Sequence, residues 1–388
     1  MRTYSSLKAT ATALLLILLA MAQPGFGTDI TVKRVPDGGI QPQAVADPRG
    51  VLHLIYFKGD PAGGDIFYTF SKDAGGRFSP PITVNSQSGS AIAMGNIRGA
   101  HIALGAKGRV HVAWMGSNTA APRGPDKEAP MLYTRLNDAG TAFEPQRNVI
   151  TSNYGLDGGG TVAADDKGDV YVVWHGGGEG KGEGEDFRSV WVARSTDDGK
   201  TFAAEKCALS ASTGACGCCG ISAQADATGT VRVLYRSAGE KVNRDMFLLT
   251  SRDKGTTFAG EKLDEWNANI CPMSTASLSA SATETVISWE NKGQIYFGHV
   301  APNTKAVAPV AAPGQGQGRK HPSIAVNATG ETLLVWTEGM GWAKGGSLSW
   351  QLYDKSGLPT QKGTERGVPK WSLVSAIVRP DGGFTILY

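Results

Sequence analysis

The sequence predicts an all-β protein, and within that class a β-propeller of seven blades. Three observations support this prediction. A frame of 16 residues recurs seven times at intervals of 47 to 61 residues, and four of the segments between these frames share one turn motif. Glycine supplies 52 of the 388 residues and is spread along the whole chain, as expected for a repeat protein with many tight turns.

The N-terminal segment has the pattern of an export signal. A positively charged start precedes an apolar run over residues 9–22, which ends in A-M-A, a typical cleavage site. The run is shorter than the ~20 apolar residues that cross a bilayer. We therefore predict a signal peptide over residues 1–22, a single propeller domain over 23–388, and a secreted or periplasmic protein without a membrane anchor.

Each copy of the 16-residue frame has the pattern of a β-hairpin. In HPSIAVNATGETLLVW (321–336), apolar residues alternate on both sides of the turn NATGE, and the second run ends on an aromatic residue. The other six copies end on Tyr56, Trp114, Trp174, Tyr235, Trp289 and Tyr388. Seven hairpins of one pattern predict the inner strand pairs of seven blades.

A second strand–turn–strand unit follows four of these hairpins, and its turns read SKDAGGRF, LNDAGTAF, STDDGKTF and SRDKGTTF. In each turn we expect the aspartate to accept backbone N–H groups, the glycine to adopt a positive φ, and the phenylalanine to pack between strands. The aspartates are Asp73, Asp138, Asp197 and Asp253. The glycines are Gly75, Gly140, Gly199 and Gly255.

These four turns resemble the Asp-box, or BNR, repeat of the sialidase family, and the resemblance covers essentially the whole chain after residue 22. Four strands per repeat, repeated radially, form a propeller. Sialidases have six blades, whereas the seven hairpins here predict seven. We expect the strand 29–35 to join the last hairpin (373–388) and close the ring. Six blades plus an extra hairpin is the alternative.

The predicted topology places the long loops on one face. With strands named A to D from the axis outward, the A–B turns and the Asp-boxes lie on one face, and the B–C and D–A loops lie on the other. The long connections are all of the second kind; among them are 85–100, 115–130, 175–189 and 209–220. Long loops on a rigid scaffold usually carry binding residues, so this loop-rich face is the predicted functional face.

Four of the five cysteines are predicted to meet near the axis on the loop-rich face. Cys216, Cys218 and Cys219 precede the fourth inner hairpin, and Cys271 precedes the fifth. Disulfides are the first interpretation, because clustered cysteines in an exported chain usually pair. A copper or zinc site is the second, because thiolates bind both metals. A catalytic thiol is the third, and the sequence itself assigns no cofactor.

The resemblance also implies a set of sialidase residues to look for in this sequence. Sialidases use three arginines that bind a carboxylate, a tyrosine nucleophile activated by a glutamate, and an aspartate as acid/base. The family's F-R-I-P motif is absent, and Ile40 stands where its arginine would be. A cationic rim for an anionic ligand is predicted from arginines on the loop-rich face, namely Arg98, Arg236 and Arg319. The candidate catalytic residues are Tyr154, Asp157 and Glu290.

Three functions therefore stay open. The first is a binding propeller for a glycan or another anionic small ligand, with Trp342 and Trp371 available for stacking on sugars. The second is a diverged exo-sialidase or related glycoside hydrolase, and the third is a thiol-based copper or zinc protein. A net charge of +3 without any basic block argues against nucleic acid as a partner. We expect a monomer.

Overall fold

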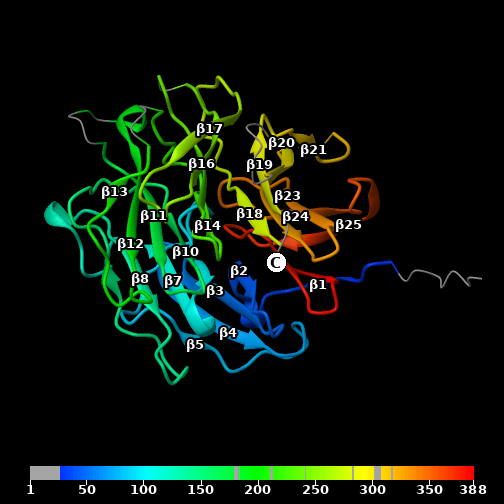
Figure 1. Cartoon of the computed structure of the whole chain (residues 1–388), viewed down its shortest axis with the longest axis horizontal. Helices are drawn as coiled ribbons and strands as arrows, with labels where there is room; N and C mark the ends of the chain where they lie inside the picture. The colour runs from blue at the N-terminus through cyan, green and yellow to red at the C-terminus, as the bar shows by residue number, and fades with distance from the viewer. Residues whose placement is uncertain are drawn as a thin grey trace, which may run out of the picture.

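The structure, a computed structural model, describes residues 27–178, 182, 184–209, 213–240, 242–281, 284–300, 307–315 and 318–388. Within these ranges seven sheets follow one another around a common axis, in the order of the chain (Figure 1). Six of the sheets have four strands and the seventh has three. This arrangement confirms the seven-bladed propeller and excludes the six-bladed alternative. The predicted signal peptide lies outside the described residues.

The first three blades contain the following strands. Blade 1 has β2 (Ile40–Ala46), β3 (Leu52–Asp60), β4 (Gly63–Ser71) and β5 (Ile82–Thr83). Blade 2 has β6 (His101–Leu104), β7 (Val110–Met115), β8 (Met131–Arg135) and β9 (Arg147–Asn148). Blade 3 has β10 (Gly160–Ala164), β11 (Val170–Gly176), β12 (Ser189–Ser195) and β13 (Lys206–Cys207).

The next three blades repeat this order. Blade 4 has β14 (Ser222–Ala225), β15 (Val231–Arg236), β16 (Met246–Ser251) and β17 (Ala259–Asp264). Blade 5 has β18 (Ser277–Ala280), β19 (Thr285–Asn291), β20 (Gln294–Val300) and β21 (Val310–Ala311). Blade 6 has β22 (Lys320–Val326), β23 (Thr332–Glu338), β24 (Gly346–Tyr353) and β25 (Pro359–Val368).

Blade 7 closes the ring with both ends of the chain. It consists of the hairpin β26 (Ser375–Val378) and β27 (Phe384–Leu387), with the N-terminal strand β1 (Ile30–Lys33) on its outer side. β1 pairs in parallel with β27 from Ile30 opposite Phe384 to Lys33 opposite Leu387, so the first strand lies beside the last in Figure 1. The closure predicted from residues 29–35 is therefore confirmed.

Only short 3₁₀ turns interrupt the strands in the described part of the chain. They are η1 (Pro36–Gly38), η2 (Ala106–Gly108), η3 (Pro125–Lys127) and η4 (Glu185–Phe187). No helix among the described residues has the length and apolar character needed to cross a membrane.

The hydrophobic core lies between the blades. The tryptophans that end three of the inner hairpins, Trp114, Trp174 and Trp289, are fully buried. Trp114 packs against side chains of blades 1 and 2, for example Ile55 and Leu132. Large aromatic side chains remove much apolar surface from water, so these positions hold neighbouring blades together.

Three of the four Asp-box turns have the predicted structure. The Asp73 carboxylate accepts the N–H of Arg77 at 2.8 Å, and Asp197 and Asp253 accept the equivalent N–H groups at 2.9 Å. The glycine of each turn has a positive φ, between 69° and 90°. Each phenylalanine packs at the boundary with the preceding blade, as Phe202 does between blades 2 and 3.

The blade 2 turn corrects the prediction for Asp138. The Thr141 N–H binds the side-chain oxygen of the preceding residue, Asn137, at 3.0 Å. Asn137 therefore takes the capping position one residue earlier. In this blade Leu136 stands where the other three turns have a serine whose hydroxyl binds the aspartate. Asp138 instead forms an ion pair with Arg109.

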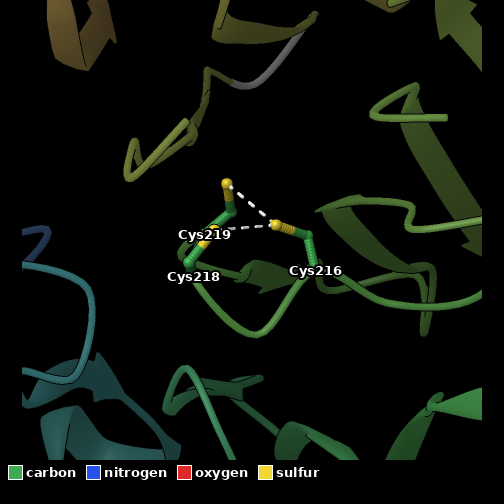
Figure 2. A group of neighbouring side chains, drawn as sticks. All are labelled: Cys216, Cys218 and Cys219. Atoms are coloured by element: carbon green, nitrogen blue, oxygen red, sulfur yellow. Dashed lines mark hydrogen bonds between the residues drawn. The ribbon is translucent and has the colours of Figure 1, made fainter. Parts of the chain in front are cut away.

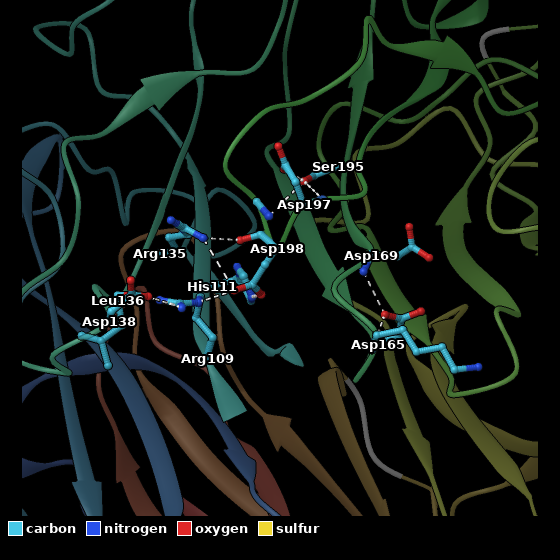
Figure 3. A network of polar contacts seen from close by, with 12 residues as sticks. Arg109, His111, Arg135, Leu136, Asp138, Asp165, Asp169, Ser195, Asp197 and Asp198 are labelled. Carbon is cyan, nitrogen blue, oxygen red and sulfur yellow. Dashed lines mark hydrogen bonds and ion pairs between the residues drawn. The ribbon is translucent and has the colours of Figure 1, made fainter. Parts of the chain in front are cut away.

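The Asp-box face is covered by a polar network that links neighbouring blades (Figure 3). Asp198, in the blade 3 Asp-box, forms ion pairs with Arg109 and Arg135 of blade 2 and faces the His111 imidazole at 3.4 Å. Its backbone N–H donates to the carbonyl of Gly168, in the A–B turn of its own blade, at 2.9 Å. The A–B turns and the Asp-boxes thus share one face, as predicted.

The long loops gather on the opposite face and contact one another. Between 115–130 and 85–100, the Ser117 N–H donates to the Ser90 carbonyl at 3.0 Å. Between 209–220 and 175–189, the Ala215 N–H donates to the Glu185 carbonyl at 3.0 Å.

Glu205 anchors one of these long connections, and its replacement gives a stability prediction. The buried carboxylate accepts the N–H groups of Thr151, Ser152 and Asn153 at 2.7 to 3.3 Å. Burial opposes the charged form, yet these hydrogen bonds lower the pKa of Glu205 to about 2. We expect Glu205→Gln to lower the free energy of unfolding by about 2 kcal/mol at pH 7, the value of one or two charged hydrogen bonds.

The pH dependence of this difference is the check. A depressed carboxyl pKa stabilises the fold above the unfolded value of about 4.3 and loses that effect as pH falls towards 2. Urea unfolding of wild type and Glu205→Gln should therefore show a gap that closes between about pH 4 and pH 2. A gap of constant size across this range would contradict the assignment.

Candidate functional site

The candidate site is the turn that carries three cysteines just before the inner strand of blade 4. Cys216 to Cys219 form this turn, in which the Cys219 N–H donates to the Cys216 carbonyl at 3.2 Å. The Cys216 N–H donates to the carbonyl of Arg236 at 2.9 Å and so attaches the turn to strand β15. The turn thus lies at the blade end, as the repeat predicted.

The turn also lies beside the central channel. Inner strands of the blades surround a cavity of about 540 Å³ along the axis. Gly220 and Thr275 belong to its lining, and they directly follow Cys219 and Ser274 in the chain. The Gly220 N–H donates to the Ser274 carbonyl at 2.9 Å, which joins blade 4 to blade 5 at the channel mouth.

Gly217 allows the turn to lie close against blade 3. A Cβ atom on this glycine would come within 2.3 Å of the Arg188 guanidinium and 2.6 Å of the Asp157 carboxylate. Real Cβ atoms essentially never make contacts this short, so a larger residue here would have to displace the Arg188 and Asp157 side chains. Its N–H donates to the Glu185 carboxylate at 2.8 Å, which holds the turn in place.

The three thiols form a compact group (Figure 2). The Cys216 sulfur lies 3.2 Å from that of Cys218 and 3.4 Å from that of Cys219, and all three sulfurs are within 4.8 Å of one another. Cys216 and Cys219 are buried, whereas Cys218 is half-buried. Three sulfurs at this separation can bind one metal ion after small side-chain rotations, because ligands of a common ion are a few ångströms apart.

Cys271 lies in the connection to the next blade. It is exposed, between β17 and β18, and it is not one of the three sulfurs that lie within 4.8 Å of one another. The cysteines of the turn thus come together, whereas a meeting of all four stays a prediction. Cys207 lies apart on the outer strand β13, where its thiol donates to the Leu209 carbonyl at 3.2 Å.

All five cysteines are free thiols in the structure. The disulfide between blade 4 and blade 5 that we placed first among the interpretations is therefore not present. Within the blade 4 turn, the Cys216 sulfur lies 3.2 and 3.4 Å from those of Cys218 and Cys219, longer than the ~2.05 Å of a disulfide bond. The sulfurs of the turn are therefore in non-covalent contact.

Positive charge and hydrogen bonds favour a thiolate within this group. Burial alone would raise the pKa of Cys219, but the thiols of Cys216 and Cys218, with the nearby Arg236 guanidinium, hold that pKa well below its usual range. The same hydrogen bonds raise the pKa of Cys216, because it is the donor. A low-pKa cysteine is both a good metal ligand and a good nucleophile.

Buried histidines lie near the thiols. Burial lowers the pKa of His175 to about 4 and that of His321 to about 3, while the charge of Cys219 opposes both shifts. Both rings are therefore neutral at pH 7. Both His175 nitrogens and Nδ1 of His321 have no hydrogen-bond partner, whereas His101 contacts Thr161 at 3.1 Å. His175 was not among the predicted ligands, although it directly follows Trp174 at the end of an inner hairpin.

The predicted cationic rim is replaced by separate ion pairs. The Arg98 guanidinium lies 3.0 Å from Asp157, and Arg319 lies 3.1 Å from Glu338. Arg236 and Glu290 form a pair at 3.3 Å in which both side chains are almost fully buried. Each of the three arginines thus has its own carboxylate partner, and no ion pair among the described residues joins two of the three directly.

A chain of ion pairs that we did not predict surrounds the cysteine turn. Asp157 also binds Arg188 at 3.1 Å, and Glu185 binds Arg188 at 3.7 Å and Arg244 at 2.7 Å. Burial opposes the charged form of Arg244, but its hydrogen bond and ion pair with Glu185 help to raise its pKa. No sequence motif marks this chain, because its members come from three different connections.

The candidate sialidase residues do not form a set. The Tyr154 hydroxyl donates to the Ile150 carbonyl at 3.4 Å, and its ring packs against Gly124. Glu290 accepts the Gly293 N–H at 2.6 Å inside its pair with Arg236, and burial raises its pKa. Asp157 forms ion pairs with Arg98 and Arg188. Each candidate therefore binds different neighbours.

The two predicted stacking tryptophans differ in exposure. Trp342 is 59% exposed, and its ring would come within 3.5 Å of a Cβ placed on Gly95. Trp371 is half-buried, with the Lys370 ammonium 4.8 Å from the ring centre. Trp342 is thus the one that presents an open aromatic face.

Comparisons with known proteins define the fold. Neither a scan of protein-family models nor a search of curated proteins gives a match. Among solved structures, the chain is similar to the Trypanosoma rangeli sialidase in complex with the inhibitor DANA, with 12% identity, coverage of 81% of this chain and 56% of that chain, and a TM-score of 0.52.

Two further neighbours have a TM-score of 0.50 and 15% identity. One is a protein of unknown function from Dyadobacter fermentans, with coverage of 88% of this chain and 98% of that chain. The other is a fungal alcohol oxidase of the AA5 family in complex with copper, with coverage of 89% of this chain and 69% of that chain. Similarity at this level of identity concerns the fold alone. The chain therefore has a sialidase-like propeller fold.

Proposed function

We propose that this protein is an exported propeller that binds one Cu(I) ion through the thiolates of Cys216, Cys218 and Cys219. The observation that carries the proposal is the group of three sulfurs within 4.8 Å of one another, on one turn at the channel mouth. Thiolates are soft ligands, and they select Cu(I) and zinc over hard cations.

The number of buried ligands favours Cu(I) over zinc. Structural zinc sites have four protein ligands in a tetrahedron, whereas Cu(I) is stable with two or three thiolates. Here three thiols share one turn, and the fourth, Cys271, is exposed on the next blade. We therefore assign Cys216, Cys218 and Cys219 as the ligands.

The surrounding charges support a thiolate site. Three thiolates and one Cu(I) carry two negative charges, which need positive neighbours in a buried location. Arg236 lowers the pKa of Cys219, and Arg244 interacts with Cys216 and Cys218. These two arginines are the positive neighbours of the proposed site, and each also pairs with a carboxylate, Glu290 for Arg236 and Glu185 for Arg244.

Anaerobic Cu(I) titration of the reduced protein tests this function. We expect one equivalent of Cu(I) to bind in competition with bathocuproine disulfonate, and zinc to compete far less well for the same thiols. Cysteines oxidised to disulfides in the purified protein, with no copper binding after mild reduction, would refute the proposal.

A glycan site on the same face is a second candidate, supported by the exposed ring of Trp342. Sugars stack on open aromatic faces, and Arg98 lies beside the same loop, with its guanidinium 2.7 Å from the Cβ position of Gly95. The sialidase-like fold agrees with this candidate. The ion pairs of Arg98, Arg236 and Arg319 argue against sialoside hydrolysis.

A stacking variant tests the glycan candidate. We expect Trp342→Ala to weaken binding to a responding sialylated or neutral oligosaccharide at least about tenfold, the loss of roughly 1.4 kcal/mol expected for a stacked ring. Tryptophan fluorescence titration measures this, with Leu358→Ala, another exposed apolar residue, as control. We expect no release of fluorophore from a fluorogenic sialoside. Equal binding by both variants would remove the candidate.

A further inference from the structure

One residue of blade 3 binds the main chain on both sides of Cys216. The Ala215 N–H donates to the Glu185 carbonyl at 3.0 Å, and the Gly217 N–H donates to the Glu185 carboxylate at 2.8 Å. Glu185 begins η4, in the connection between β11 and β12. Its main chain and its side chain thus both hold the segment that carries the Cys216 sulfur.

Cys216 is the thiol whose position matters most for the group. Its sulfur lies 3.2 Å from that of Cys218 and 3.4 Å from that of Cys219. Its own N–H donates to the carbonyl of Arg236 at 2.9 Å. Three consecutive N–H groups around this sulfur are therefore hydrogen-bonded, two of them to Glu185.

The Glu185 carboxylate is itself held in place. Its Oε2 lies 2.7 Å from the Arg244 guanidinium, and its Oε1 lies 3.7 Å from that of Arg188. The Arg244 side chain is only 6% exposed, and its Nε donates to the carbonyl of Ile270 at 3.1 Å. A charged acceptor fixed in this way makes a stronger hydrogen bond to the Gly217 N–H than a neutral acceptor would.

We propose that Glu185 is the positioning residue of the copper site: its carboxylate, bound to the Gly217 N–H, holds the Cys216 sulfur beside those of Cys218 and Cys219. This inference rests on the proposed function and deepens it. A residue that orients a metal ligand without touching the ion commonly contributes about 10- to 100-fold to the affinity. Glu185 therefore sets how tightly the turn binds Cu(I), although it supplies no ligand atom.

The alternative is that Glu185 acts only through its charge. Loss of a negative charge beside thiolates favours their charged form, so this alternative predicts tighter Cu(I) binding when the carboxylate is removed. It predicts the same change in Glu185→Gln and Glu185→Ala. The positioning role predicts weaker binding in Glu185→Ala alone, because glutamine keeps an acceptor oxygen for the Gly217 N–H and alanine does not.

Anaerobic Cu(I) competition with bathocuproine disulfonate tests the inference. We expect Glu185→Ala to weaken binding at least about tenfold and Glu185→Gln to stay within about threefold of wild type. The matched control is Asp186→Ala, which removes the neighbouring carboxylate of the same 3₁₀ turn. The Oδ1 atom of Asp186 has no hydrogen-bond partner in the described part of the chain, so this variant should bind copper like wild type.

A double variant separates an effect through Cys216 from a general loosening of the fold. When Cys216→Ser is already present, Glu185→Ala should change the affinity by less than about threefold, because the sulfur that it positions is gone. The Ala215 hydrogen bond to the main chain of residue 185 is kept in every variant, and circular dichroism checks that each is folded.

Three results would overturn the inference and leave the proposed function standing. The first is a loss of less than about tenfold in Glu185→Ala, and the second is an equal loss in Glu185→Gln. The third is an undiminished effect of Glu185→Ala when Cys216→Ser is present. Failure of the wild-type protein to bind Cu(I) would instead overturn the proposed function and this inference together.

Discussion

Replacing Cys216 with serine is expected to lower the affinity for Cu(I) by at least about 100-fold, because loss of an outer-shell partner alone costs a metal site 10- to 100-fold and a direct ligand costs more. Cys216 has the central position in the group, with sulfur contacts of 3.2 Å to Cys218 and 3.4 Å to Cys219. A serine hydroxyl is a hard ligand that stays protonated at pH 7, so it does not replace the thiolate.

The measurement is a Cu(I) competition titration of the reduced protein, with Cys207→Ser as the matched control. Both variants replace a cysteine by serine. Cys216 lies in the connection 209–220 and belongs to the three-sulfur group, whereas Cys207 lies just before this connection and does not. We expect Cys207→Ser to bind copper like wild type. Equal affinities for Cys216→Ser and Cys207→Ser would show that the cluster is not the copper site.

Replacing Glu290 with alanine is expected to lower the free energy of unfolding by about 3–5 kcal/mol, the usual cost of leaving a buried charge without its partner. Arg236 and Glu290 lie 3.3 Å apart, with only 3% and 2% of their side chains exposed. Without the carboxylate, Arg236 keeps its hydrogen bonds to the carbonyls of Arg244 and Glu290 but loses its counter-charge.

Urea unfolding of Glu290→Ala, and of a double variant that also carries Arg236→Met, shows whether the loss of stability comes from the unpaired charge of Arg236. If the cost comes from an unpaired buried charge, the double variant should recover most of it, because a well-packed apolar pair is often as stable as a buried ion pair. A stability loss below about 1 kcal/mol in Glu290→Ala would contradict the structural role of the pair and restore Glu290 as a candidate site residue.

Most of the fold could be predicted because the sequence repeats it. Each inner hairpin carries its own alternation of apolar residues and its own terminal aromatic residue, so one copy identifies the others. The closure by residues 29–35 followed from counting strands, since the seventh hairpin had no partner strand after it. The error at Asp138 arose because neighbouring Asn137 offers a similar side-chain oxygen, and the sequence pattern does not distinguish which of the two caps the turn.

The candidate site could be predicted only in its location. The frame placed Cys216, Cys218, Cys219 and Cys271 at one end of adjacent blades, and the structure brings the first three into one group. The state of the thiols could not be predicted, because a disulfide and a thiol cluster need the same cysteines within a few ångströms of each other. The predicted export favoured disulfides, whereas all five cysteines are free thiols in the structure.

The partners of the three rim arginines could not be predicted, because sequence position says nothing about which group a charged residue meets. Arg98, Arg236 and Arg319 each meet a carboxylate from a different strand or loop, and the pair of Arg236 with Glu290 is inside the protein. The pairing depends on the approach of connections that are far apart in the chain. Arg188 and Arg244 were not predicted for the same reason, although both lie near the cysteine turn.

X-ray absorption at the copper edge of the Cu(I)-loaded protein tests the central claim most directly. The account predicts a first coordination shell made of sulfur alone, from two or three thiolates, and the loss of this shell in Cys216→Ser. A first shell of nitrogen or oxygen atoms, or an unchanged sulfur shell in Cys216→Ser, would show that copper binds elsewhere on the propeller and that the clustered thiols have another function.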